Sequence, residues 1–144
     1  MAKPFLCAAG VTLRKQIDAR FPRRDKSSDG WIGDAAHQAR PSDHNPDFSA
    51  GGVVRAIDVD KDLSKDKKSS WELADQIRLA AKTDKRIKYV IHQGQITSAR
   101  SLWRWRKHNG NPHHFHIHIS FNKSGDKDGA KFDIPLLAKR VVKK

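Results

Sequence analysis

The stretch that decides the fold reads Pro112-His113-His114-Phe115-His116-Ile117-His118-Ile119-Ser120-Phe121. Polar and apolar residues alternate along it from position 114 to position 121, which is the pattern of a β-strand with one buried face. The polar face would carry imidazoles about 7 Å apart, because a strand rises roughly 3.3 Å per residue. Imidazole is a common metal ligand and carries protons near neutral pH. The stretch therefore predicts a metal or acid–base site, with a solvated edge strand as the alternative.

Length and charge favour a single basic domain over residues 1–144, with a short N-terminal arm (1–10) and a basic C-terminal tail (131–144). The chain has 29 lysines and arginines against 16 aspartates and glutamates, a formal net charge of +13. Such a surface attracts polyanions, whether nucleic acid, acidic lipid or the anionic polymers of a cell envelope. Charge alone does not choose among them.

Cys7 is the only cysteine, which excludes an intramolecular disulfide and a cysteine-based zinc finger. No stretch approaches the roughly 20 apolar residues that a membrane span needs. The apolar run at 5–11 is short for a signal peptide. We therefore expect a chain that is made in a cytoplasm without a signal peptide and does not span a membrane.

Hydrophobic periodicity predicts two helices and several short strands around one long loop, residues 23–52. The helices are expected over 13–21 and over 71–81, the second capped by Ser69 or Ser70. The strands are expected at 53–60, 89–92, 95–97, 103–106 and, after turn residues 109–112, along the alternating residues 114–121. These elements predict an α+β domain with a small, mostly antiparallel sheet and helices packed on one side.

The histidine strand alone does not make a catalytic zinc site, which takes three protein ligands and a water. His44 lies in the long loop, where ligands are commonly displayed. Asp58 and Asp60 fall on the polar side of an otherwise apolar strand, where a carboxylate is costly unless it is paired or coordinated. A salt bridge to an arginine is the alternative role for Asp58.

Three spaced motifs, Ser42-x-His44, Ala56-x-Asp58 and His116-x-His118, together resemble those of the zinc peptidases of bacterial cell walls. This group includes D-alanyl-D-alanine dipeptidases and carboxypeptidases, penicillin-insensitive murein endopeptidases and many phage endolysins. The pattern His113-x-x-His116-x-His118 is similar to the late motif of the murein endopeptidases. The blocks at 30–37 and 42–47 resemble small bacterial and phage members, and the likeness covers about 13–121.

One departure from the family pattern is a longer loop between the early histidine and the aspartate. Val54 holds the place of the usual glycine two residues before Ala56, and the glycines stand at Gly51 and Gly52. The choice of Asp58 over Asp60 therefore follows the Ala-x-Asp match. The resemblance implies the fold shared by Hedgehog proteins and D-Ala-D-Ala peptidases.

Carried over by position, the resemblance implies a Zn²⁺ ion held by His44, Asp58 and His118. It makes His116 the residue that handles the proton, with His113 as an auxiliary group, since the late motif has no glutamate.

Further residues are candidates for substrate contacts. Arg40 would stabilise an oxyanion or grip a substrate carboxylate, with a solvated arginine as the alternative. Ser42 is a candidate substrate-binding residue. Trp103 and Trp105 would wall a substrate groove, with core packing as the alternative for at least one of them.

The function implied is a zinc peptidase that cuts a stem or cross-link peptide of peptidoglycan, and the expected partners are this peptide and the anionic envelope. A phage lysis enzyme is favoured, made in the host cytoplasm and acting on the wall after release, as a monomer with no obligate protein partner. The sequence leaves open which peptide bond is cut. The alternative is a nucleic-acid-binding protein or nuclease, with residues 103–107 as a patch for base stacking and phosphate binding.

Overall fold

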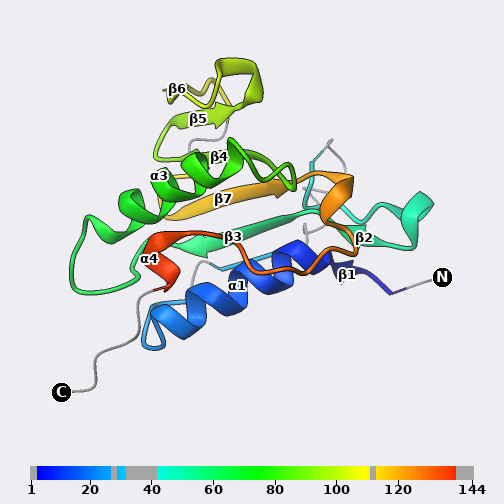
Figure 1. Ribbon diagram of the computed structural model, residues 1–144, viewed down its shortest axis with the longest axis horizontal. Helices are drawn as coiled ribbons and strands as arrows, with labels where there is room; N and C mark the ends of the chain where they lie inside the picture. Colours follow the sequence, from blue (N-terminus) through cyan, green and yellow to red (C-terminus); the bar gives the residue numbers. More distant parts are fainter. Residues whose placement is uncertain (1–2, 27–28, 32–41, 111–112, 139–144) are drawn as a thin grey trace.

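The histidine-rich stretch forms an inner strand of a five-stranded antiparallel sheet in the computed structural model (Figure 1). The structure describes residues 3–26, 29–31, 42–110 and 113–138. The sheet order is β3-β7-β4-β5-β6, and a separate parallel pair joins β1 to β2. The strands are β1 (Phe5–Leu6), β2 (Val53–Val54), β3 (Ala56–Asp60), β4 (Ile87–His92), β5 (Gln95–Ser98), β6 (Arg106–Lys107) and β7 (His116–Phe121).

The helices lie on one face of this sheet (Figure 1), and we call the other face, which carries Asp58 and His118, the polar face. They are α1 (Ala8–Arg20), α3 (Ser69–Ala81) and α4 (Pro135–Ala138), with 3-10 turns at Phe48–Ala50, Ala99–Ser101 and Lys123–Gly125. Ile57 and Val59 of β3 and Ile117 and Ile119 of β7 are buried in the core with the helices. Because side chains alternate along a strand, Asp58 and His118 project from the opposite face. The predicted α+β class, with an antiparallel sheet and helices on one side, is confirmed.

Several element boundaries differ from the sequence prediction. The expected strand at 53–60 is interrupted at Arg55, whose backbone N–H donates to the Asp43 carbonyl. The histidine strand begins at His116, and the chain before it bends at His114 and Phe115 and has a left-handed backbone at His113 (φ 53°). His114 therefore lies outside the strand. Helix α3 begins at Ser69, and its N-cap Lys68 makes no side-chain capping hydrogen bond.

The strand expected at 103–106 is wrong. Leu102 and Trp103 have φ values of 56° and 59°, so the chain turns there instead of extending. The Trp103 N–H donates to the Ser98 carbonyl and closes this turn. Only Arg106 and Lys107 pair as a strand, with Ile96 and Gln95 of β5.

Neither end of the described chain is a free arm. Leu6 and Cys7 are buried near the N-terminal end, and the pKa of the Cys7 thiol is raised to about 11 by burial. The expected tail at 131–144 is corrected for residues 131–138, since Ile134 and Leu136 are buried core residues. The Leu136 N–H donates to Oε1 of Gln76 on α3 at 2.6 Å. Apolar residues at alternate positions, not the basic charge, decide where this segment lies.

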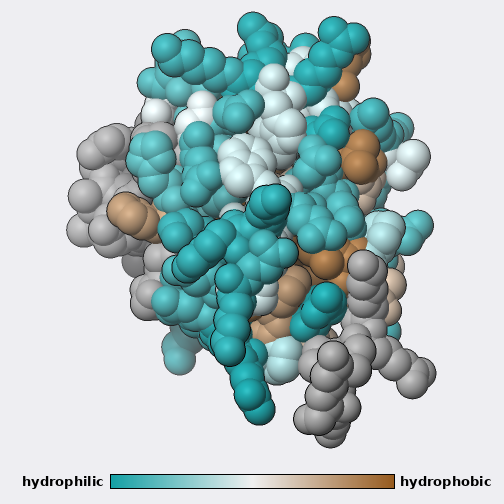
Figure 2. All heavy atoms as spheres, turned by 90° about the vertical axis from the view of Figure 1, so that its left-hand side faces the viewer, coloured by the Kyte–Doolittle hydropathy of each residue, from teal (hydrophilic) through white to brown (hydrophobic). Residues whose placement is uncertain are grey.

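The surface seen from the left-hand side of Figure 1 is mostly hydrophilic, with apolar residues in small separate groups (Figure 2). Within the described parts of the chain, no helix has both the length and the apolar character needed to cross a membrane.

Candidate metal centre

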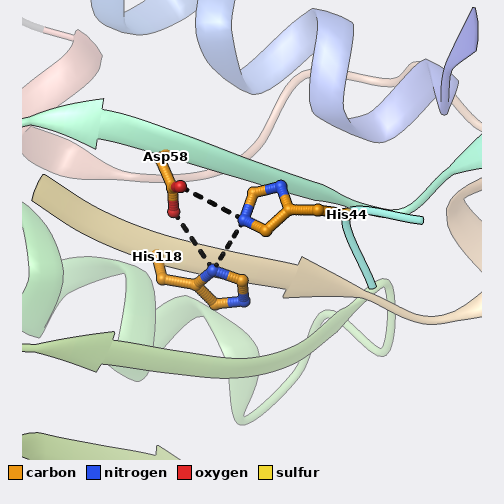
Figure 3. Close-up of side chains that lie close together, drawn as sticks. All are labelled: His44, Asp58 and His118. Atoms are coloured by element: carbon orange, nitrogen blue, oxygen red, sulfur yellow. Dashed lines mark hydrogen bonds and ion pairs between the residues drawn. The ribbon is translucent and has the colours of Figure 1, made fainter. Parts of the chain in front are cut away.

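Three side chains from distant parts of the sequence meet on the polar face of the sheet: His44, Asp58 and His118 (Figure 3). Asp58 on β3 stands directly opposite His118 on β7 in the antiparallel register. Residues paired in this way project from the same face with their side chains in contact. His44 approaches from the loop before β2, which is tied to the sheet by the hydrogen bond from Arg55 to the Asp43 carbonyl.

The spacing of the donor atoms suits a small tetrahedral ion. Nε2 of His44 lies 3.2 Å from Oδ2 of Asp58 and 3.1 Å from Nδ1 of His118. Nδ1 of His118 lies 3.1 Å from Oδ1 of Asp58. Ligand atoms placed tetrahedrally around zinc at about 2.0–2.1 Å stand about 3.4 Å from one another. The cluster is thus close to the size that zinc requires.

The outer nitrogen of each histidine is engaged elsewhere, so the inner nitrogen is available to a metal. Nδ1 of His44 donates to the Trp31 carbonyl at 3.0 Å, which leaves the Nε2 lone pair facing the cluster. Nε2 of His118 lies 2.7 Å from the hydroxyl of Ser120, two residues along β7. Partners of this kind fix the ring orientation and the tautomer of metal-binding histidines. Two imidazole nitrogens and one carboxylate are ligands that suit Zn²⁺.

Electrostatics within the cluster favour a bound positive charge. Burial raises the pKa of Asp58, but hydrogen bonds from His118 and His44 outweigh burial and hold this pKa well below its usual range. Burial lowers the pKa of His44, while its contact with Asp58 raises it, and the net shift is upward. For His118 burial prevails and the pKa is lowered. The site therefore keeps an ionised carboxylate and attracts a cation, either a proton or a metal.

A second pair of histidines, His113 and His116, lies beside the three donors. Nδ1 of His113 and Nε2 of His116 are 2.8 Å apart, and Nε2 of His116 is 3.4 Å from Oδ2 of Asp58. Burial and the neighbouring His118 lower the pKa of His113 to about 3. The His113 ring is therefore neutral near neutral pH. Nε2 of His116 lies beside the donor set, and an imidazole nitrogen in this position can accept or donate a proton.

Tyr89 and Ser120 complete the packing around His118 and were not anticipated from the sequence. The Tyr89 ring stacks on the His118 ring with centroids 5.4 Å apart and 17° between the planes. Burial raises the pKa of Tyr89 to about 12, so the phenol stays neutral. The alternation of β7 and β4 places both residues on the polar face, and this pattern is the signal that would have found them.

The structure brings Asp58, and not Asp60, to the two histidines. Asp60 is buried near the end of β3, where its Oδ1 accepts a hydrogen bond from the Asp62 backbone. The Ser42 hydroxyl accepts a hydrogen bond from the His44 backbone N–H at 3.1 Å, so Ser42 contacts the loop that carries His44. Arg40 lies outside the described residues.

The two tryptophans proposed for a substrate groove pack elsewhere. Nε1 of Trp105 donates to Asp75 of α3 at 2.9 Å, and its ring meets Trp71 of α3 edge-on at 5.1 Å. The Trp103 carbonyl accepts a hydrogen bond from Arg78 of α3. Both rings are partly buried against the hydrophobic core. They contact the helix layer, whereas the three donors lie on the opposite face of the sheet.

The chain matches no protein-family model, no curated protein and no solved structure, so its function is inferred from the side chains of this site.

Proposed function

We propose that the chain is a zinc-dependent peptidase that hydrolyses a peptide bond in the stem or cross-link peptide of bacterial peptidoglycan. The observation that carries this proposal is the convergence of His44 Nε2, Asp58 and His118 Nδ1 within 3.2 Å of one another. When bound there, zinc supplies Lewis acidity toward a peptide carbonyl and lowers the pKa of water.

His116 is the proposed proton carrier, and the composition of the chain supports this role. The only glutamate in the sequence is Glu72, in the first turn of α3 on the helix side of the sheet. Nε2 of His116 lies beside the donor set, 3.4 Å from Asp58, and is held by His113 at 2.8 Å. A histidine so placed takes a proton from an attacking water and returns it to the leaving amine.

The choice of peptidoglycan as substrate is supported by the likeness to cell-wall zinc peptidases in the Ser-x-His, Ala-x-Asp and His-x-His motifs. The net charge of +13 also favours adsorption to an anionic envelope. Both the motifs and the positive charge are consistent with a phage lysis enzyme. Such an enzyme is made in the host cytoplasm and acts on the wall as a monomer after release.

The test compares purified wild-type protein with His118→Ala and His114→Ala. His114 is an exposed histidine outside the cluster, four residues before His118, and serves as the matched control. Metal is measured by elemental analysis, and peptide cleavage by the new amino groups released from purified peptidoglycan. We expect bound zinc and amine release for wild type and His114→Ala, and loss of both for His118→Ala.

The identity of the bond follows from mass spectrometry of the released peptides. Full lysis by folded His118→Ala, or lysis by wild type that persists after complete chelation of zinc, contradicts the proposal. Steeply salt-dependent binding to DNA or RNA without any amine release favours the nucleic-acid alternative instead.

A further inference from the structure

The polar face that carries the three donors continues across the whole sheet to its far edge. Cross-strand pairing aligns Asp58 with His118, His118 with Ile91, Ile91 with Ile96, and Ile96 with Arg106. Directly paired residues of antiparallel strands share a face, so this row begins at the metal donors and ends on β6. Three strand spacings separate His118 from Arg106, a distance of about 14 Å.

At the far end of this row the surface is hollowed. A hollow of about 390 Å³ lies over β5, the following 3-10 turn and β6. Ile96 and Ser98 are on the same face as the donors, because they pair with Ile91 and Tyr89 of β4. The lining includes Ile96, Ser98, Arg100, Arg106, Lys107 and His108. We call this site the β5–β6 basic hollow.

The charge of the hollow is uncompensated within the described part of the chain. Arg100, Arg106 and Lys107 are exposed and form no ion pair with any described carboxylate, and no acidic residue lines the hollow. By contrast, Arg55 and Arg86 pair with aspartates at 2.8 Å or less. The guanidinium groups of Arg100 and Arg106 at one open hollow form a receptor for an anion, because guanidinium groups bind carboxylates with two parallel hydrogen bonds.

We propose that the β5–β6 basic hollow binds a carboxylate of the peptide substrate that lies across the polar face of the sheet. This inference rests on the proposed peptidase function and adds a subsite remote from the bond that is cut. An extended peptide covers about 14 Å in roughly four residues. The carboxylate recognised is thus about four residues from the scissile bond, which requires a cross-linked peptide longer than a dipeptide.

A nucleic acid is the less favoured occupant because the neighbouring tryptophan rings are partly buried and offer limited surface for base stacking. Trp103 and Trp105 are partly buried against the core, and the Trp105 ring already meets Trp71. Binding of single strands depends on such exposed stacking platforms in addition to a positive groove. A peptide carboxylate needs only the guanidinium groups.

The test measures kcat and KM of the zinc-loaded full chain on two matched substrates. One is a soluble cross-linked dimer of peptidoglycan peptides, and the other is the same dimer with its carboxylates converted to primary amides by carbodiimide and ammonia. The variants are Arg106→Gln and Arg100→Gln. Arg104→Gln is the control, since Arg104 is an exposed arginine of the same segment that does not line the hollow.

We expect each hollow variant to lower kcat/KM on the acidic dimer about fivefold, the upper range for an exposed ion pair. The loss should fall on KM with kcat unchanged, because a remote contact binds the substrate and the transition state equally. On the amidated dimer the hollow variants should equal wild type. Arg104→Gln should equal wild type on both substrates.

If Arg104→Gln and Arg106→Gln lower kcat/KM on the acidic dimer equally, the effect comes from net charge and the inference is overturned. The inference is also overturned if Arg106→Gln has the kcat/KM of wild type, or if its kcat/KM falls by the same factor on both substrates. In these cases hydrolysis by wild type persists and the proposed peptidase stands. If wild type hydrolyses neither dimer and binds RNA or DNA through these arginines, both the subsite and the peptidase are refuted.

Discussion

Ser120→Ala tests whether the site is organised by a hydrogen bond behind the metal ligand. The hydroxyl of Ser120 lies 2.7 Å from Nε2 of His118, while Nδ1 of the same ring faces Asp58 at 3.1 Å. Ser120 is fully buried, so bulk water does not replace the lost hydroxyl. Removing it leaves the outer nitrogen of the ligand without its partner and frees the ring orientation.

The expected effect is on zinc affinity more than on folding. Loss of such an outer partner weakens metal binding about 10- to 100-fold, or about 1.4–2.7 kcal/mol. The assay is a competition titration of the protein against a chromophoric zinc chelator at neutral pH. Urea unfolding of the metal-free protein shows separately that the variant is folded.

Thr97→Val is the matched control for this experiment. Thr97 is fully buried on β5, and its hydroxyl has no hydrogen-bond partner among the described residues. Valine removes one buried hydroxyl from the same sheet with almost no change in shape, and we expect unchanged zinc affinity with equal or greater stability. If Ser120→Ala binds zinc as tightly as Thr97→Val, the ring of His118 is not held as described and the reasoning fails.

Three further predictions concern the donors, a buried histidine and the C-terminal segment. Asp58→Asn removes the only carboxylate of the donor set, so zinc content and peptide release should both be lost, and a variant that retains stoichiometric zinc would contradict the assignment. His92 is fully buried and its pKa is lowered to about 4 by burial, so the unfolded chain takes up its proton first as the pH falls. In metal-free protein the free energy of unfolding should therefore drop by about 2 kcal/mol more in wild type than in His92→Gln between neutral pH and about pH 4.5, and parallel pH profiles would refute this. Ile134→Ala should cost about 2–5 kcal/mol in urea unfolding, since Ile134 is a core residue, whereas an unchanged midpoint would mean that this segment is not packed.

The sequence was sufficient to predict helices α1 and α3, most of strands β3, β4, β5 and β7, and the faces of β3 and β7. Alternation in β7 and β3 assigned His118 and Asp58 to the polar side because a strand has only two faces, and the structure agrees. Local periodicity failed at Trp103, where a left-handed backbone turn replaces an extended chain. It also failed at residues 131–138, where basic charge hides a buried apolar pattern.

By itself, the sequence determined which side chains are available: an early histidine, an aspartate on a strand and a histidine row, with one glutamate in the whole chain. Only the tertiary structure decided that Asp58 on β3 lies opposite His118 on the adjacent strand β7, and that His44 reaches both residues from a loop. The physical reason is that strand register and loop closure depend on packing between residues 60 to 74 positions apart, which no local pattern contains. The alignment of Arg106 with the donors arises in the same way, from the order of strands in the sheet.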